Sequence, residues 1–183
     1  MEAIQKYTLA ALVENEAGVL SQVSRLIARK GFNIESLTVG ATDNPAISRM
    51  TIEVMTDESH ITLICNQLRK MFSVFSVKLL DPEQSIRREL VLIKVSTPTH
   101  NERNEVIQIA NIFRASIIDV SHTTITISLI GDDSKTNAIE DLLREFGILE
   151  LLRTGITALE RGTHTIYEET KERGEFNYGK NVL

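Results

Sequence analysis

The stretch "ENEAGVLSQVSRLIARKGFNIESLTVG", residues 14–40, decides the fold and raises the question of function. Apolar residues in its middle recur at helical spacing, which predicts a helix over residues 18–30 that ends at Gly31. Extended segments at residues 6–14 and 33–41 flank this helix. A strand therefore runs through a short polar turn into a helix, and the chain returns as a second strand.

The same alternation of elements continues to about residue 81. The pattern predicts strands at residues 47–55 and 73–80. A helix between them carries one apolar stripe, made of Ile61, Ile64, Cys65, Leu68 and Met71. The resulting order is βαββαβ, which is the order of a ferredoxin-like domain.

This order recurs in the second half of the chain. The predicted elements are a strand at 88–97, a helix at 102–113, strands at 116–120 and 124–130, a helix around Ile139 to Phe146, and a strand at 148–159. Asp81-Pro82-Glu83 is the natural joint between the halves. We predict an α+β fold of two ferredoxin-like βαββαβ domains in tandem, at residues 1–81 and 82–162.

Residues 163–183 form a polar, charged tail with little periodicity. The tail is expected to be an exposed arm, with either a short helix at 164–173 or disorder. Its aromatic residues, Tyr167, Phe176 and Tyr178, have two interpretations: they dock onto a partner, or they belong to a solvated tail.

Composition narrows the class of protein. The 183 residues are 42% hydrophobic and 25% charged, as in a packed globular protein, and the net charge of −5 argues against nonspecific nucleic-acid binding. No apolar run is long enough to span a membrane, and no secretory signal is visible. The single cysteine, Cys65, excludes an internal disulfide. We therefore expect a soluble, cytoplasmic protein.

Groups that carry catalysis or bind metals are sparse. The four histidines are scattered, and none has another metal ligand at a suitable spacing. No glycine-rich phosphate-binding or dinucleotide-binding motif is present, and the apolar stripe makes Cys65 a core residue rather than a nucleophile. The central strands carry no aromatic residues on which RNA bases could stack. We expect no metal, cofactor or catalytic residue in this chain, although catalytic groups can also converge from distant positions.

The turn before the first helix is the best candidate for a ligand site. A helix N-terminus offers unpaired N–H groups to an anion, and Gly18 permits a close approach to the backbone. Asn15 and Asn33 each supply a donor and an acceptor. Such groups suit the carboxylate and ammonium of a free amino acid. The alternative is purely structural: Asn15 caps the helix, Gly18 makes a turn and Asn33 lies in a loop.

Longer stretches of the sequence resemble one protein family. "LVENEAGVLSQVSRLIARKGFNIESLTVG" followed by "DNPAISRMTIEV" is similar to the start of the regulatory (small) subunits of acetohydroxyacid synthase, also called acetolactate synthase. "IFRASIIDVSHTTITISLIG" and "LLRTGITALERG" resemble the second half of the same subunits. The resemblance covers about residues 5–162 and implies that the first domain is an amino-acid-binding ACT domain.

The resemblance also implies a function. Subunits of this family do not catalyse a reaction; they activate a catalytic subunit that condenses pyruvate with pyruvate or 2-oxobutyrate, and they confer feedback inhibition by valine, sometimes by leucine or isoleucine. The catalytic subunit is expected to hold thiamine diphosphate, magnesium and FAD. A homodimer is implied, with the effector pocket between the helix start of one chain and the second strand of the other.

The family's effector site falls on seven positions of this sequence: Asn15, Gly18, Val19, Leu20, Asn33, Ile34 and Gly40. Relatives often have alanine at the position of Gly40, so the smaller residue leaves strict valine selectivity open. Two other functions stay as alternatives: a free-standing amino-acid sensor that acts on another enzyme or regulator, and an enzyme on a ferredoxin-like scaffold.

Overall fold

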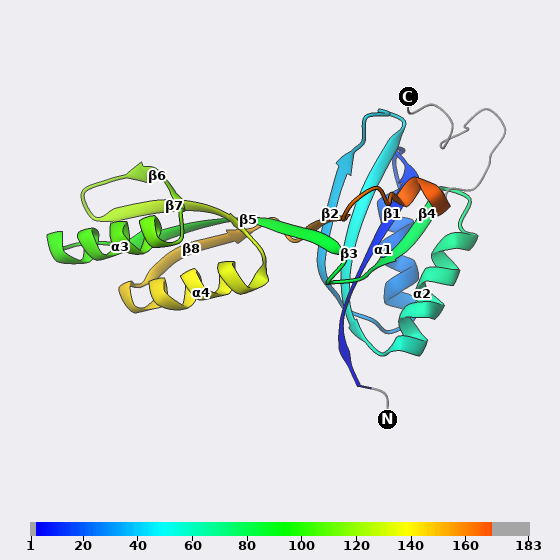
Figure 1. Ribbon diagram of the computed structural model, residues 1–183, viewed down its shortest axis with the longest axis horizontal. Helices are drawn as coiled ribbons and strands as arrows, with labels where there is room; N and C mark the ends of the chain where they lie inside the picture. The colour runs from blue at the N-terminus through cyan, green and yellow to red at the C-terminus, as the bar shows by residue number, and fades with distance from the viewer. Residues whose placement is uncertain (1–2, 170–183) are drawn as a thin grey trace. The chain divides into compact units, whose positions relative to one another are not determined.

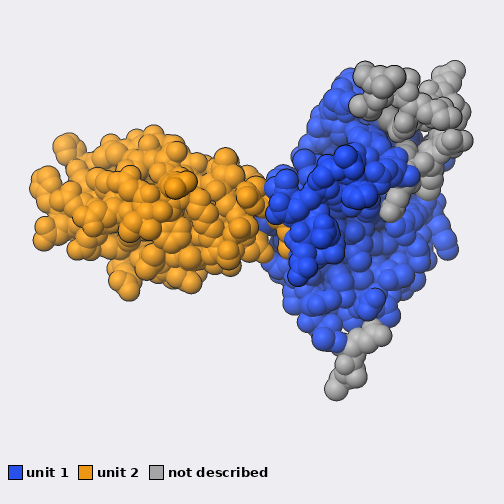
Figure 2. Space-filling model, viewed as in Figure 1, with its two compact units in different colours: residues 1–86, 156–183 blue, residues 87–155 orange. Residues whose placement is uncertain are grey.

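The computed structural model describes residues 3–169 and divides them into two compact units (Figures 1 and 2). Unit 1 comprises residues 3–86 and 156–169 of the described chain, and unit 2 comprises residues 87–155. Unit 2 is therefore inserted in the sequence between the two segments that form unit 1.

Unit 1 is a four-stranded antiparallel sheet with two helices. Its elements are β1 (Gln5–Glu14), α1 (Val19–Arg29), β2 (Ile34–Ala41), β3 (Ile47–Thr56), α2 (Glu58–Lys70) and β4 (Val74–Leu80). The strand order is β2-β3-β1-β4, which leaves β2 at one edge (Figure 1). The predicted βαββαβ order and the ferredoxin-like fold are confirmed.

The main core of unit 1 lies between the sheet and the two helices. It contains the apolar stripe of α1, namely Val19, Val23 and Ile27, and the stripe of α2, which includes Ile64 and Cys65. Cys65 is 3% exposed, so its assignment to the core is confirmed. The strands contribute the side chains that point to this face, such as Leu9, Ala11, Val13, Met50, Ile52 and Val54.

Unit 2 repeats this architecture. Its elements are β5 (Ser85–Ser96), α3 (His100–Ile112), β6 (Ser116–Val120), β7 (Thr124–Gly131), α4 (Asp133–Leu143), the 3₁₀ helix η1 (Arg144–Phe146) and β8 (Ile148–Arg153). The order β6-β7-β5-β8 is equivalent to the order in unit 1. Valine, isoleucine and leucine side chains of β5 and β7 pack against Val106 and Ala110 of α3 and against Ile139 and Leu143 of α4.

A buried charge network supports unit 2. The Arg153 guanidinium donates to a carboxylate oxygen of Glu89 at 2.9 Å and to one of Glu140 at 2.6 Å. The Thr136 hydroxyl donates to Glu89 at 2.6 Å, and Arg144 also pairs with Glu140. The side chains of Glu89 and Glu140 are only 4% and 11% exposed, so Arg153 compensates two carboxylates that have lost most of their water.

The boundaries of the second unit differ from the sequence-based prediction. The strand predicted at 148–159 is broken into β8 and β9 (Thr157–Glu160), because Gly155 between them takes a left-handed φ of +85°. Residues 156–169, here called the return segment, belong to unit 1 rather than to a domain spanning 82–162. The segment comprises β9, which pairs with β5, and the 3₁₀ helix η2 (Ile166–Glu169).

The return segment covers the face of the unit 1 sheet opposite the helices, here called the outer face. Ile156, Ala158 and Ile166 are each at most 3% exposed and form a second cluster. The sheet supplies the other members of this cluster, Ala10, Leu12, Ile47, Phe75 and Leu80. η2, drawn in orange in Figure 1, lies beside β1 and β4.

The first residues of the predicted polar tail are thus part of the fold. The Ser76 hydroxyl donates to the Ile166 carbonyl at 2.9 Å, and the Tyr167 hydroxyl donates to Asp43 at 3.3 Å. Tyr167 therefore docks onto its own chain. The structure replaces the expected helix at 164–173 by η2 over its first part. Phe176, Tyr178 and the rest of the tail lie outside the described residues.

Candidate functional site

The turn between β1 and α1 is fixed by Asn15 and Gly18. The Asn15 backbone N–H donates to the Ala46 carbonyl at 2.8 Å, and its side-chain amide donates to the Pro45 carbonyl at 2.9 Å. Gly18 then takes a φ of +91°, a conformation that L side chains rarely adopt. Asn15 thus ties the β1–α1 turn to the β2–β3 turn, and the alternative in which its side chain caps α1 is wrong.

Helix α1 begins without a cap. Gly18, the N-cap residue, has no side chain that could accept from the first N–H groups of α1, and the first turn of the helix contains no acidic residue. By contrast, α2, α3 and α4 are capped by the side chains of Asp57, Thr99 and Asp132, and each has an acidic residue in its first turn. The Val19 N–H donates to the Glu16 carbonyl at 3.4 Å, and no side chain caps the rest of the α1 N-terminus, which retains its positive dipole end.

The first two residues of α1 point in different directions. Val19 is 4% exposed and belongs to the core, so its side chain is not available to a ligand. Leu20 is 43% exposed and presents an apolar side chain to solvent in this single chain. No side chain fills the space beside Gly18, since a Cβ added there meets no atom within 4 Å.

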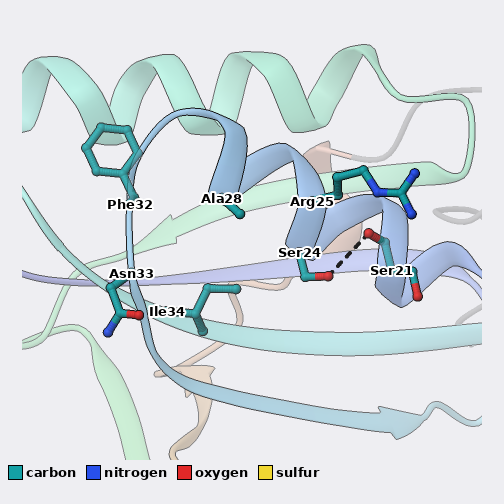
Figure 3. Close-up of a pocket in the computed structure, with 7 residues that line it drawn as sticks. All are labelled: Ser21, Ser24, Arg25, Ala28, Phe32, Asn33 and Ile34. Carbon is teal, nitrogen blue, oxygen red and sulfur yellow. Dashed lines mark hydrogen bonds between the residues drawn. The ribbon is translucent and has the colours of Figure 1, made fainter.

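Asn33 and Ile34 line a shallow cavity beside the other end of α1 (Figure 3). The cavity has a volume of about 430 Å³. Its remaining lining residues are Ser21, Ser24, Arg25 and Ala28 of α1, and Phe32. The Asn33 amide donates to Glu35 at 3.2 Å, and the Phe32 ring lies 5.2 Å from the ring of His60. The cavity combines an apolar wall with one cation, Arg25.

The helical residues of this cavity were missed by the sequence reasoning. Ser21, Ser24, Arg25 and Ala28 recur at helical spacing on the face of α1 opposite its buried stripe. The sequence signal for this face is a row of small residues with one cation. It is weak on its own because a solvated helix face has the same composition.

Gly40 lies near the far end of β2 and apart from this cavity. It is paired with Arg49 of β3, whose side chain points to the outer face. Paired residues in an antiparallel sheet share a face, so a side chain at position 40 would point away from α1. A Cβ added there meets no atom within 4 Å.

The structure thus separates the sequence-predicted site residues into groups. Gly18 lies at the start of α1 and Asn33 lies beyond its end. The 11 residues of α1 span about 16 Å at 1.5 Å per residue. A small amino acid is too short to contact both ends of the helix in one chain.

Within 3–169, no group of three or more His, Cys, Asp or Glu side chains is arranged to hold a metal ion. Over the same range, no helix has the length and apolar character needed to cross a membrane.

Comparison with known proteins decides the family. A model described as an AHAS small subunit-like ACT domain matches residues 9–76, and a model described as the small subunit of acetolactate synthase matches residues 88–162. The chain belongs to the acetolactate synthase small-subunit family. The suspected resemblance is thereby confirmed, and the first unit is an ACT domain.

Individual members of the family agree along most of the chain. A probable acetolactate synthase small subunit of Methanothermobacter thermautotrophicus is 46% identical over 160 residues, which cover 87% of this chain and 95% of that protein. The acetolactate synthase small subunit of Aquifex aeolicus is 45% identical over 169 residues, covering 92% and 88% of the two chains. The crystal structure of the small subunit from Thermotoga maritima matches with a TM-score of 0.81 and 39% identity, covering 88% of this chain and 100% of that one.

Proposed function

We propose that this small-subunit family member is a non-catalytic regulatory subunit, which activates the acetolactate synthase catalytic subunit and makes it sensitive to valine. The observation that carries the proposal is the pair of family matches: an ACT domain over residues 9–76 and the small-subunit domain over 88–162. A free-standing amino-acid sensor would account for the first match and leaves the second unexplained.

The separation of the site residues supports a site made by two copies of the chain. If two α1 helices pack antiparallel about a twofold axis, the start of one helix lies beside the end of the other. Gly18 of one copy then approaches Asn33 of the second copy. The small side chains Ser21, Ser24 and Ala28, on the face of α1 that points away from the sheet, would let the two helices approach closely.

The edge of the sheet supports the same arrangement. Among the described strands, β2 pairs only with β3, so its other edge keeps unpaired N–H and C=O groups. Leu20 and Val39 are 43% and 42% exposed, which is apolar surface that pairing of β2 with its symmetry mate would help to cover. We propose that the homodimer pairs β2 with β2.

In this site the effector's carboxylate and its side chain have separate partners. Its carboxylate would meet the uncapped N-terminus of α1 in one copy. Its apolar side chain would lie against Ala28, Phe32 and Ile34 in the other copy, where the cavity wall is apolar. We propose valine as the effector, with leucine and isoleucine as competitors, because one methylene discriminates by only about 1–3 kcal/mol in an apolar pocket.

The chemistry of the reaction belongs to the partner in this proposal. The catalytic subunit would hold thiamine diphosphate, magnesium and FAD, and this chain would bind none of them. The regulatory chain then acts only by changing the free energy of the catalytic subunit's states, which requires different contacts in the active and inhibited states.

The decisive experiment is an acetolactate assay of the catalytic subunit with and without this chain, while valine is titrated. We expect no turnover by this chain alone, a higher rate when it is added, and loss of that gain as valine rises. Turnover of pyruvate by the isolated chain would refute the non-catalytic function. An unchanged rate, together with no recovery of the catalytic subunit in a pull-down, would favour the free-standing sensor.

A further inference from the structure

In the return segment, the backbone N–H and C=O of Ile156 both form hydrogen bonds with side chains of β2. The Ile156 N–H donates to the Ser36 hydroxyl at 3.1 Å, and the Thr38 hydroxyl donates to the Ile156 carbonyl at 3.0 Å. Two residues further on, the Arg49 guanidinium donates to the Ala158 carbonyl at 2.8 Å. These contacts fix the start of the return segment onto the outer face, where no backbone ladder to β2 is present within the described residues.

Ile156 is also the residue at which the chain re-enters unit 1. Unit 2 ends at Gly155, whose φ of +85° allows the chain to turn sharply there. Ile156 itself is 2% exposed, because its side chain packs in the apolar cluster of the outer face. The re-entry point is therefore anchored by two hydroxyl contacts and by apolar packing.

The strand that carries these hydroxyls also carries the proposed effector contacts. β2 begins at Ile34, which lines the cavity where we place the effector's side chain. Ser36 and Thr38 are paired in register with Glu53 and Thr51, on the outer face. As an edge strand with one neighbour, β2 is less constrained than β1 or β3, so a ligand that contacts its start can displace it.

We infer that Ser36 and Thr38 are positioning residues that transmit effector binding from β2 to the re-entry point of the chain at Ile156, and through it to unit 2. The inference rests on the proposed function and adds the route by which the bound effector is sensed. The physical link is direct: a movement of β2 must either carry the Ile156 backbone with it or break both hydroxyl contacts. Coupling of this kind is a free energy between two sites, so it can be lost while binding survives.

The test removes the two hydroxyl groups and keeps the shape of the side chains. The variant Ser36→Ala/Thr38→Val is compared with wild type in three measurements: the valine Kd of the regulatory chain by calorimetry, the activation of the catalytic subunit without valine, and the valine concentration that gives half-inhibition. We expect the Kd to stay within about threefold and activation to persist, while half-inhibition requires about tenfold more valine.

Two matched variants distinguish a loss of effector transmission from a general loosening of the return segment. Ser76→Ala removes the hydroxyl contact between β4 and Ile166, which holds the same segment from a strand without effector contacts, so inhibition should remain normal. Ser36→Thr/Thr38→Ser keeps both hydroxyls and should keep inhibition. Normal inhibition in Ser36→Ala/Thr38→Val, or an equal loss in Ser76→Ala, would overturn the inference. A wild-type chain that binds none of valine, leucine and isoleucine would overturn the proposed function, and this inference with it.

Discussion

The turn before α1 places two requirements on position 18, and glycine meets both of them better than any other residue type. Its φ of +91° lies in the left-handed region, where a β-carbon costs about 1–2 kcal/mol. Its missing side chain leaves the N–H groups of α1 uncovered, and the space beside it is open. The residue thus sets both the direction of the turn and the access of an anion to the helix.

Replacing Gly18 by aspartate should abolish valine inhibition and leave activation intact. The new carboxylate would lie where we propose the effector's carboxylate, repel it and occupy the same N–H groups. The attraction of an anion to a helix end is worth about 0.3–1 kcal/mol when exposed and about 2 kcal/mol when partly buried, so repulsion can cancel it. The measurement is the valine titration of the reconstituted synthase.

Two controls accompany this variant. The asparagine of Gly18→Asn has nearly the same shape as aspartate, tolerates the left-handed conformation and carries no charge. This variant should therefore weaken inhibition less than Gly18→Asp. Gly18→Ala should lower the free energy of unfolding by about 1–2 kcal/mol and fill little of the site. Normal valine sensitivity in a folded Gly18→Asp protein would show that the carboxylate does not bind at this helix end.

At the scale of elements, the helix starts differ in chemistry. Asp57, the cap of α2, accepts the His60 backbone N–H at 2.9 Å and interacts with the His60 ring at 2.7 Å and the Ser59 hydroxyl at 2.8 Å. These hydrogen bonds lower the pKa of Asp57 from 3.8 to about 2, the backbone bond to His60 having the largest effect. The ionised cap therefore stabilises the folded state.

The pH dependence of this contribution follows from its sign. A carboxyl group with a lowered folded-state pKa contributes stability that is complete above its unfolded pKa of 3.8 and is lost as the pH falls through about 2. We expect Asp57→Asn to melt below wild type at pH 6, and the gap in melting temperature to shrink between pH 4 and pH 2. A gap that stays constant over this range would mean that the charge of Asp57 does not matter.

The network around Arg153 predicts a large loss of stability in unit 2. Arg153→Ala would leave the buried Glu89 without its cation and Glu140 with Arg144 alone, and breaking a buried pair in this way typically costs about 3–5 kcal/mol. Lys94→Ala is the control, because its pair with Glu150 is exposed and worth at most about 1 kcal/mol. Denaturant unfolding of both variants measures the difference; similar losses would refute the importance of the network.

Periodicity was sufficient to predict the elements but not their ends. The apolar stripes of α1 and α2 and the alternation in β7 are local signals, and each matches the structure. The polar residues that alternate with apolar ones in β3 are buried as well, because the return segment covers their face. The observed start of α3 at His100 lies two residues before the predicted start at 102, because the capping box of Thr99 and Glu102 begins the helix there. The chemistry of the residues points to Asn15, Gly18 and Asn33, whereas the other four site residues follow only from the family resemblance. One chain alone leaves Gly18 and Asn33 at opposite ends of a helix.

At the scale of the whole molecule, the sequence could not show the return of the chain to unit 1. Residues 148–159 read as one strand, and only Gly155 hints at the break. The contacts that decide the boundary are long-range, such as those between Ser36 and Ile156 or between Lys78 and Glu160, which pair at 2.8 Å. Local patterns contain no information about such partners.

This boundary changes what a minimal effector-binding fragment must contain. A fragment of residues 1–81 would expose the apolar outer-face cluster and remove Ala158 and Glu160, which pair with Arg49 and Lys78. A fused chain that joins residues 1–86 to 156–169 through about six glycine and serine residues should bind valine and melt well above the short fragment. Thermal melts with and without valine compare the two. Equal melting temperatures would show that the return segment adds nothing to the stability of unit 1.

The order in which the chain is synthesised follows from the same return segment. The first 86 residues leave the ribosome without the residues that cover the outer face, which end at position 169. At about 5–20 residues per second, the missing 83 residues (169 − 86) take roughly 4–17 s to appear. Unit 2 is continuous in sequence, so it can complete its core first, and the unit encoded first matures last. A chain that ends at residue 155 and has been released from the ribosome should therefore be cleaved by protease in unit 1 while unit 2 resists.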